Sequence, residues 1–188
     1  MELHIVGGFL GSGKTTAIAR AARHLMAQGK RVGVVTNDQG KYLVDTMFLN
    51  LADVPTVEVS GGCFCCHYND LNDQLDRLID EVKPDVIFAE SVGTCANVVS
   101  TIIRPLTELR ERPSSFTVFT DARMLRRRIN DQPLPFSDEI VYIFDQQLEE
   151  TAMLIINKID LLSPEDADEL VRKVQARFPH KTIRVQNS

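Results

Sequence analysis

The sequence has no long apolar run and no excess of positive charge. None of its hydrophobic stretches approaches the ~20 residues that a membrane-spanning helix requires. The amino end, Met1 to Val6, has no basic segment before its apolar residues, so a secretory signal is not indicated. The formal net charge is −5, which argues against a nucleic-acid partner because such partners select basic surfaces. We therefore expect a cytoplasmic protein that binds neither membranes nor nucleic acids.

Cysteine is scarce and unevenly placed. Four cysteines occur in 188 residues, and three of them are Cys63, Cys65 and Cys66. Their spacing is too tight to cross-link distant parts of a fold. In a reducing compartment, such a cluster is more typical of a metal or redox site than of structural disulfides.

Short apolar runs alternate with longer amphipathic segments. The predicted strands are Leu3 to Val6, Val32 to Thr36, Thr56 to Val59, Val86 to Ala89, Phe116 to Phe119, Met153 to Ile156 and Thr182 to Val185. The predicted helices are Thr15 to Gln28, Asn69 to Val82, Asn97 to Arg110 and Ser163 to Phe178. Strands that are apolar almost throughout are buried on both faces. We predict a single three-layer α/β domain over residues 1–188, with a mostly parallel sheet covered by helices on both faces.

Two local features complete this outline. Ser163 followed by Pro164 is typical of a helix start, and Asn130 to Ser137, with two prolines, is predicted to be a surface loop. The basic run Arg126 to Arg128 is interpreted as the solvent-exposed face of a helix.

Residues Gly8 to Thr15, GFLGSGKT, match the phosphate-loop pattern G-x-x-x-x-G-K-[ST] between a predicted strand and a predicted helix. The alternative is a glycine-rich turn that matches the pattern by chance, and the flanking strand and helix argue against it. Glycines allow backbone N–H groups to converge on phosphate oxygens, Lys14 brings positive charge to the β- and γ-phosphates, and Thr15 offers a hydroxyl to Mg²⁺. We predict a nucleoside triphosphate site formed by Gly8, Gly11, Ser12, Gly13, Lys14, Thr15 and Thr16.

A second motif, Asn157-Lys158-Ile159-Asp160, follows a predicted strand and indicates a base-binding site. The carboxylate of Asp160 can accept two hydrogen bonds from the ring N–H and amino group of guanine, and adenine has no matching pair of donors. Lys158 would lie along the base, and Asn157 would hold neighbouring loops. The alternative is an ordinary turn of polar residues. Residues 186–188 are weaker candidates for additional base contacts.

Acidic residues after two other strands are candidates for the Mg²⁺ centre. Glu90 ends a strand that should lie beside the phosphates, where it would bind a Mg²⁺-bound water or orient the attacking water. Gly93 would let an N–H approach the γ-phosphate. Asp38, in the stretch Thr36 to Gly40, and Asp45 are further candidates in a segment that we interpret as a nucleotide-dependent switch.

The segment GGCFCCH, Gly61 to His67, is the candidate site for a soft metal ion. Three thiolates suit such an ion and leave a fourth position open for transfer. His67 is an alternative fourth ligand, Cys95 is interpreted as a small buried residue, and a reversible disulfide or inert buried cysteines remain alternatives. Because neighbouring elements carry both sites, metal and nucleotide binding are expected to be coupled.

Together, GGFLGSGKTT, GGCFCC, the Glu90 to Gly93 segment and NKID resemble the CobW/HypB/UreG family of metal-handling GTPases, in particular its CobW-like branch with the C-x-C-C motif. The resemblance implies a SIMIBI-type P-loop fold, slow Mg²⁺-dependent hydrolysis of GTP to GDP and phosphate, and delivery of zinc or cobalt to a client metalloprotein. It also implies two sets of ligands: Cys63, Cys65 and Cys66 for the transition metal, and Lys14, Thr15, Asp45 and Glu90 around Mg²⁺ and phosphate.

Three departures from the family pattern stand out. Asn37-Asp38-Gln39-Gly40 replaces the usual Asn-Glu-Phe-Gly, and Glu90-Ser91-Val92-Gly93 replaces Glu-(Thr/Ser)-Ser-Gly. The family's carboxyl-terminal domain is absent, so we expect the chain to be a truncated GTPase domain. A nucleotide-dependent homodimer is a further candidate assembly. The competing functions are a metal-sensing module that uses GTP as a structural ligand and a P-loop kinase of small molecules.

Overall fold

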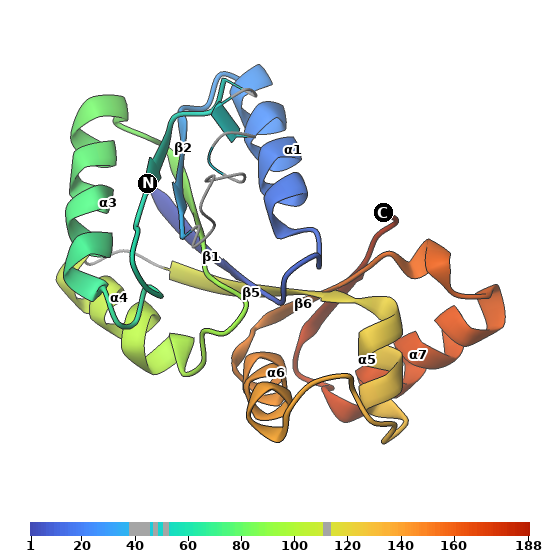
Figure 1. Ribbon diagram of the computed structural model, residues 1–188. Helices are drawn as coiled ribbons and strands as arrows, with labels where there is room; N and C mark the ends of the chain where they lie inside the picture. The colour runs from blue at the N-terminus through green and yellow to red at the C-terminus, as the bar shows by residue number, and fades with distance from the viewer. Residues whose placement is uncertain (38–45, 47–48, 51–52, 111–113) are drawn as a thin grey trace.

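The computed structural model describes residues 1–37, 46, 49–50, 53–110 and 114–188. Seven described strands form one sheet in the order β3-β2-β4-β1-β5-β6-β7 (Figure 1). Every neighbouring pair is parallel, so the predicted mostly parallel sheet is parallel throughout its described strands. All predicted strands are confirmed to within two residues at each end. The strands are β1 (Glu2–Gly7), β2 (Val32–Thr36), β3 (Thr56–Glu58), β4 (Val86–Glu90), β5 (Ser114–Asp121), β6 (Met153–Asn157) and β7 (Thr182–Val185).

Helices connect these strands. They are α1 (Lys14–Ala27), α3 (Tyr68–Val82), α4 (Arg104–Arg110), α5 (Ala122–Ile129), α6 (Asp138–Glu150) and α7 (Pro164–Arg177), with a 3₁₀ turn η2 (Ile159–Leu161). The helix predicted over Asn97 to Arg110 is confirmed as one continuous helical segment, which begins with a π-helical turn, η1 (Val99–Ile103), and continues as α4. The π-helical hydrogen bonds come just before Pro105, which has no N–H with which to continue a regular α-helical ladder.

Helices α5 and α6 flank the predicted loop. Helix α6 was not predicted, and the only part of α5 expected to be helical was the basic run Arg126 to Arg128. This run lies on α5, but two of its side chains form ion pairs and are not simply solvent-exposed. Arg126 Nη2 lies 2.6 Å from Asp166 of α7, and Arg128 binds Asp145 of α6 through Nε and Nη2 at 2.7 and 2.8 Å. These ion pairs join α5 to its two neighbours.

The start of α7 is as predicted. The side chain of Ser163 accepts a hydrogen bond from the N–H of Asp166, and Pro164 is the first helical residue. This cap satisfies one of the N–H groups that the first turn of a helix leaves unpaired.

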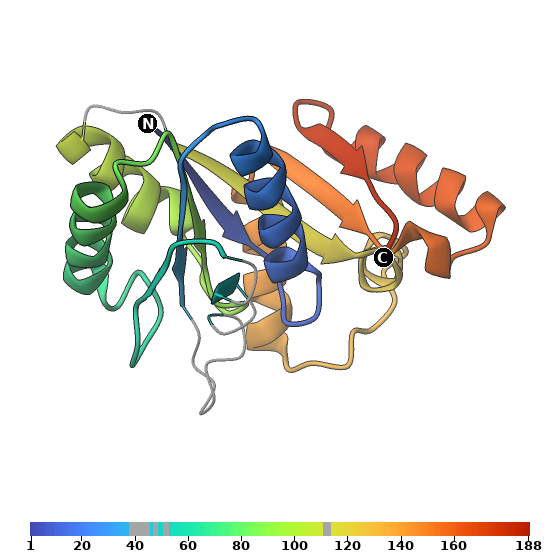
Figure 2. The ribbon, with the colours of Figure 1, turned by 90° about the horizontal axis from the view of Figure 1, so that it is seen from above.

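Side chains that alternate along the strands form two cores on opposite faces of the sheet. On one face, Val6 and Val34 pack with Ile18 and Ala22 of α1. On the other, Ile5 and neighbouring strand residues pack with α3, α4, α5, α6 and α7. Seen from above, α1 crosses the sheet, and α3 and α7 lie toward its opposite ends (Figure 2). A hollow of about 510 Å³ lies beside α1, over β5 and β6.

The parallel sheet brings the carboxyl ends of its strands to one edge. The phosphate loop follows β1, Asn37 follows β2, and Glu90, Asp121 and Asn157 end β4, β5 and β6. Among the described residues, no helix combines the length and hydrophobicity needed to span a bilayer.

Candidate nucleotide and metal sites

The loop between β1 and α1 has a backbone that requires glycine. Gly8, Gly11 and Gly13 have φ values of 126°, 74° and 96°, which L-residues rarely adopt. A Cβ at Gly8 would overlap the carbonyl of Phe119, and one at Gly13 would overlap the amide of Asn157. The Ser12 hydroxyl is buried and has no hydrogen-bond partner among the described residues. The loop therefore holds a polar group ready for an added acceptor such as a phosphate oxygen.

Lys14 lies inside this loop and is 7% exposed. Its Nζ donates to the carbonyl oxygens of Gly8 and Phe9 at 2.8 and 3.2 Å, and it lies 3.8 Å from Oε1 of Glu90. These acceptors fix the ammonium group at the centre of the loop.

Thr15 and Glu90, two of the residues predicted for the Mg²⁺ centre, contact each other directly. The Thr15 hydroxyl donates to Glu90 Oε1 at 2.8 Å, and Glu90 is 6% exposed. Gly93 packs on the loop from the same side, because a Cβ there would lie 3.1 Å from the Leu10 nitrogen and the Phe9 Cα. Thr16 is exposed in the first turn of α1.

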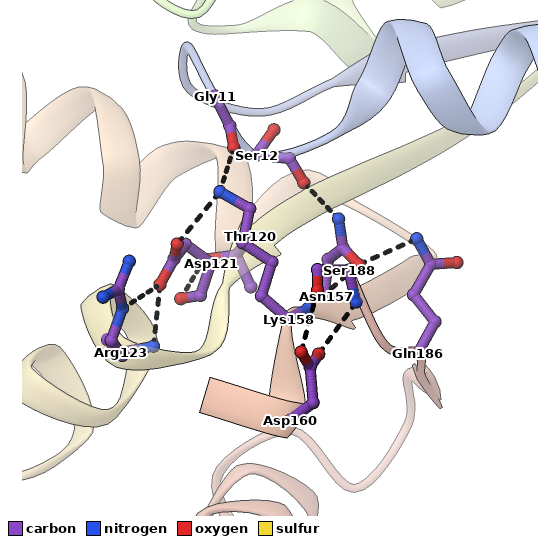
Figure 3. A network of polar contacts seen from close by, with 10 residues as sticks. All are labelled: Gly11, Ser12, Thr120, Asp121, Arg123, Asn157, Lys158, Asp160, Gln186 and Ser188. Atoms are coloured by element: carbon purple, nitrogen blue, oxygen red, sulfur yellow. Dashed lines mark hydrogen bonds and ion pairs between the residues drawn. The ribbon is translucent and has the colours of Figure 1, made fainter. Parts of the chain in front are cut away.

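Asn157 connects the phosphate loop to the segment that follows β7 (Figure 3). Its Nδ2 donates to the Ser12 carbonyl at 2.8 Å, and its Oδ1 accepts from the Lys158 N–H and from Gln186 Nε2 at 2.9 and 3.0 Å. Asn157 is 4% exposed, so this amide is a buried brace between three segments.

Lys158 bridges the loop and the end of β5. Its Nζ donates to the Gly11 carbonyl at 2.6 Å and lies 3.3 Å from Asp121 Oδ2, as Figure 3 shows. The other carboxylate oxygen of Asp121 caps α5 by accepting from the Arg123 N–H at 2.9 Å. Burial raises the pKa of Asp121, but hydrogen bonds from Arg123 and Lys158 outweigh it and hold that pKa below its usual value.

Asp121 is a site residue that the sequence interpretation missed. The available signal was the same as for Glu90, an apolar strand that ends in an acidic residue. A cavity of about 110 Å³ opens between Asp121, Lys158 and the phosphate loop, with Phe9 and Phe144 among its lining residues.

Asp160 lies beside this network and accepts two adjacent hydrogen bonds. Ser188 donates its backbone N–H to Oδ1 and its hydroxyl to Oδ2, each at 2.8 Å (Figure 3). These bonds lower the pKa of the exposed Asp160 carboxyl group. The carboxylate thus receives a side-by-side pair of donors, which is the arrangement that a guanine edge also offers.

Three cysteine thiols gather in the turn before α3. The Cys63 sulfur lies 2.9 Å from that of Cys65 and 3.2 Å from that of Cys66, and all three lie within 4.8 Å of one another. The N–H groups of Cys66 and His67 donate to the Cys63 carbonyl at 3.0 Å, which closes the turn. The predicted ligands are therefore brought together by local backbone structure.

The thiols are not equivalent. Burial raises the pKa of Cys63, but its hydrogen bonds with Cys65 and Cys66 outweigh this effect, and the net pKa of Cys63 is lowered. Burial, followed by the hydrogen bond to Cys63, raises the pKa of Cys65. The hydrogen bond to Cys63 raises that of the exposed Cys66. Cys63 is thus the first of the three to become a thiolate, which is the form that binds metals.

His67 and Cys95 lie near the cluster. The imidazole of His67 fills the space that a side chain at Gly62 would occupy, but it is not part of the mutually close group of described ligand atoms. Cys95 is buried, as expected, in the core cluster against which Cys63 and Cys65 pack.

Asn37 joins the end of β2 to the cysteine turn. Its Nδ2 donates to the carbonyls of Val59 and Gly62 at 2.9 and 2.6 Å. The rest of the predicted switch, Asp38 to Gly40 and Asp45, lies outside the described residues.

Comparison with known proteins identifies the family. The model of the CobW/HypB/UreG nucleotide-binding domain matches residues 2–184. A zinc chaperone CobW from a Sinorhizobium species is 26% identical over 97% of this chain and 57% of its own length. The zinc chaperone YeiR of Escherichia coli is 28% identical over 90% of this chain and 50% of its own.

The solved structure of the hydrogenase maturation factor HypB from Archaeoglobus fulgidus aligns with a TM-score of 0.65 at 17% identity, over 98% of this chain and 80% of that one. This likeness supports the fold. The chain spans about half the length of the two zinc chaperones it matches. On the match over residues 2–184, the chain belongs to the CobW/HypB/UreG family of P-loop GTPases, within its nucleotide-binding domain.

Proposed function

We propose that this chain binds and hydrolyses GTP and uses that cycle to carry a transition metal, with zinc preferred over cobalt, to a client metalloprotein. One observation carries the proposal. Three thiols lie within 4.8 Å of one another in a domain whose phosphate loop places Lys14 and Thr15 against Glu90. Relatives named as zinc chaperones support the choice of metal.

Guanine is the proposed base because of the chemistry of Asp160. An ionised carboxylate that already accepts two parallel bonds from Ser188 can accept the ring N–H and the amino group of guanine in the same way. Lys158, held at 2.6 Å from the Gly11 carbonyl, would flank the base with its aliphatic stem.

The phosphates and Mg²⁺ are assigned to the loop and its acidic neighbour. The glycine-rich backbone and the buried Ser12 hydroxyl would donate to phosphate oxygens, and Lys14 would exchange loop carbonyls for the β- and γ-phosphates. The Thr15 hydroxyl and the Glu90 carboxylate provide the hard oxygen ligands that Mg²⁺ prefers. When bound, the ion neutralises charge on the phosphates during transfer.

The transition metal is the cargo in this scheme. Three thiolates satisfy three positions of a tetrahedral ion such as zinc and leave one position open to a further ligand. A site of this kind can hold an ion and still pass it on by ligand exchange. Cys63, with its lowered pKa, would make the first contact.

We further propose that residues 1–188 are the GTPase domain of a longer, cytoplasmic protein, because the matched region makes up 57% and 50% of its two zinc-chaperone relatives. Reduced thiols, which metal binding requires, persist in that compartment.

The test measures phosphate release from GTP by the purified chain, with Mg²⁺ and with Zn²⁺ added in stoichiometric steps. We expect slow release that changes with Zn²⁺ up to one equivalent, and little release from ATP. If neither the rate of phosphate release nor the affinity for GTP changes with Zn²⁺, the result would favour a metal-sensing module in which GTP is a structural ligand. Transfer of the phosphoryl group to a small molecule would favour a kinase.

A further inference from the structure

Cys95 lies in the segment between Glu90 of β4 and the π-helical turn η1, close to the nucleotide site in sequence. Its thiol is turned into the core, where the residue is 1% exposed. Its N–H donates to the Val92 carbonyl at 3.2 Å, and its own carbonyl accepts from Gln147 Nε2 at 2.7 Å. The same Gln147 nitrogen donates to the carbonyl of Gly93 at 2.9 Å. The backbone of this segment is thus fixed from both sides.

The Cys95 thiol reaches the cysteine turn across the core. It belongs to the core cluster that contains Phe64 and against which Cys63 and Cys65 pack, and it interacts electrostatically with the thiols of those two cysteines. Burial and the neighbouring Cys63 raise the pKa of Cys95 to about 12. Cys66, by contrast, is exposed on the solvent side of the turn. The thiol of Cys95 therefore approaches Cys63 and Cys65 from the buried side.

We propose that Cys95 is the fourth thiolate ligand of the metal ion that Cys63, Cys65 and Cys66 bind, a role that rests on the proposed function of this turn. Zinc and cobalt favour four ligands at the corners of a tetrahedron. Cys66 supplies the outer corner and Cys95 the inner one. The three turn thiols lie within 4.8 Å of one another, whereas Cys95 stands outside that tight group, so closing the shell requires the turn and Cys95 to move toward each other.

His67 is the competing ligand within the described residues. Its ring packs over Gly62, and its Nδ1 is buried with no hydrogen-bond partner there. Like Cys95, His67 stands outside the close group of ligand atoms. Cys95, however, lies in the core cluster against which Cys63 and Cys65 pack and interacts with their thiols, so it is the better placed of the two.

Ligation by Cys95 would connect the metal directly to the phosphate loop. Cys95 is two residues from Gly93, which lies so close to that loop that an added Cβ would be 3.1 Å from Phe9 Cα and from the Leu10 nitrogen. A nucleotide that moves the Gly93 segment would move one metal ligand with it. Four thiolates would hold the ion and three would leave it open to exchange. Linkage then requires the metal to change nucleotide affinity by the same factor.

The test compares the spectra of the Co²⁺-loaded chain with those of Cys95→Ala and of the near-isosteric Cys95→Ser. The thiolate-to-cobalt charge-transfer intensity grows with the number of Co–S bonds, so both variants should lose about one quarter of it. Co²⁺ affinity should fall by at least about 10-fold. GTP binding to the metal-free variants reports that they are folded. Wild-type intensity and affinity in folded variants would overturn the role of Cys95.

A second readout needs no substitution. The ¹¹³Cd resonance of the Cd²⁺-loaded wild-type chain distinguishes four sulfur ligands from three. A four-sulfur shift supports Cys95, and a three-sulfur shift overturns its role while leaving the proposed metal site intact. A wild-type chain that gives no thiolate signal with either ion removes the proposed metal function and the role of Cys95 with it. His67→Ala should leave both spectra unchanged, and a change in the Co²⁺ ligand-field bands or in the ¹¹³Cd shift of that variant would assign the fourth position to His67.

Discussion

The hydroxyl of Thr15 donates a hydrogen bond to Oε1 of Glu90 over 2.8 Å, although 75 residues separate them in the chain. This contact joins the first turn of α1 to the end of β4. It places a hydroxyl and a carboxylate side by side, within reach of the Lys14 ammonium group 3.8 Å from the same oxygen. The acidic strand end that the sequence indicated is therefore part of the phosphate-loop site.

Removing the Thr15 hydroxyl should weaken Mg²⁺-dependent binding of GTP. Thr15→Val keeps the volume but loses the oxygen, and a lost bond to a charged group corresponds to a fall of about 10- to 100-fold in affinity. Thr15→Ser restores the hydroxyl and should remain near wild type. Titration of a fluorescent GTP analogue with and without Mg²⁺ measures the effect. An unchanged Mg²⁺ dependence in Thr15→Val would exclude Thr15 as a contact of the ion.

Asp160→Asn should change the choice of base. Two bonds to an ionised carboxylate are lost, so GTP affinity should fall at least about 100-fold. The new amide can donate to the C2 carbonyl of xanthine, and xanthosine triphosphate should bind better than it does to wild type. Competition against the fluorescent analogue gives both affinities. Thermal unfolding serves as the control, because Asp160 carries no buried contact. Equal losses for both nucleotides would indicate a structural role instead.

Gly13→Ala should abolish nucleotide binding, since its Cβ would overlap Nδ2 of Asn157 at a φ of 96°. Gly29→Ala is the matched control. Its φ is 81°, but a Cβ there meets nothing within 4 Å. We expect that control to lose only about 1 kcal/mol of unfolding free energy and to bind GTP normally. Normal GTP binding by Gly13→Ala would mean that the loop can move away from Asn157.

Cys65→Ser should remove metal binding without disturbing the nucleotide site. The variant keeps the size of the half-buried side chain but loses a soft ligand, and Zn²⁺ affinity should fall by at least about 10-fold. Competition with a chromogenic chelator measures it. GTP affinity in the absence of metal should match wild type, and the response of GTP hydrolysis to Zn²⁺ should disappear. A retained response would separate hydrolysis from this cluster.

The depressed pKa of Asp121 predicts a loss of stability in acid. A carboxyl group whose pKa is lower in the folded state stabilises the fold above its unfolded pKa, and that contribution is lost as pH falls through the folded value. Asp121→Asn retains the cap of α5 but not the ion pairs, so its unfolding free energy should depend less on pH below about 5. Urea unfolding at stepped pH tests this. Parallel curves for the two proteins would contradict it.

Asp121→Ala adds a separate expectation at neutral pH. Loss of the cap on α5 should lower the unfolding free energy by about 0.5–2 kcal/mol. Because Asn caps a helix as well as Asp does, Asp121→Asn isolates the charge from the cap.

The sequence predicted the sheet and the phosphate loop well because both depend on local patterns. Continuous apolar runs mark buried parallel strands, and the glycine spacing marks the loop between β1 and α1. Helix α6 also carried a local signal, since Ser137 precedes Asp138 and Glu139 in its first turn and Phe144 and Leu148 lie on its buried side. The two prolines before it predicted only the surface loop, so the helix that follows was not predicted.

The remaining site contacts join residues far apart in the chain. Gln147 binds the carbonyls of Gly93 and Cys95, Asn37 binds Gly62, and Asn157 binds Ser12. No periodicity or spacing encodes such pairs, because they arise only when the sheet order brings strand ends together. The position of Cys95 near the cysteine turn likewise depends on the fold and could not be predicted from the sequence pattern.

The parallel sheet also places the amino ends of its strands at the edge opposite the candidate nucleotide and thiol residues. The turn between α1 and β2, at Gly29 and Lys30, enters the sheet at the amino ends of its strands, opposite the phosphate loop. Lys30 is exposed, and the neighbouring Gly29 borders open space. A surface anchor or fluorescent reporter attached at Lys30 would leave the candidate nucleotide and thiol sites facing outward, so that an immobilised chain could still be titrated with nucleotide and with metal.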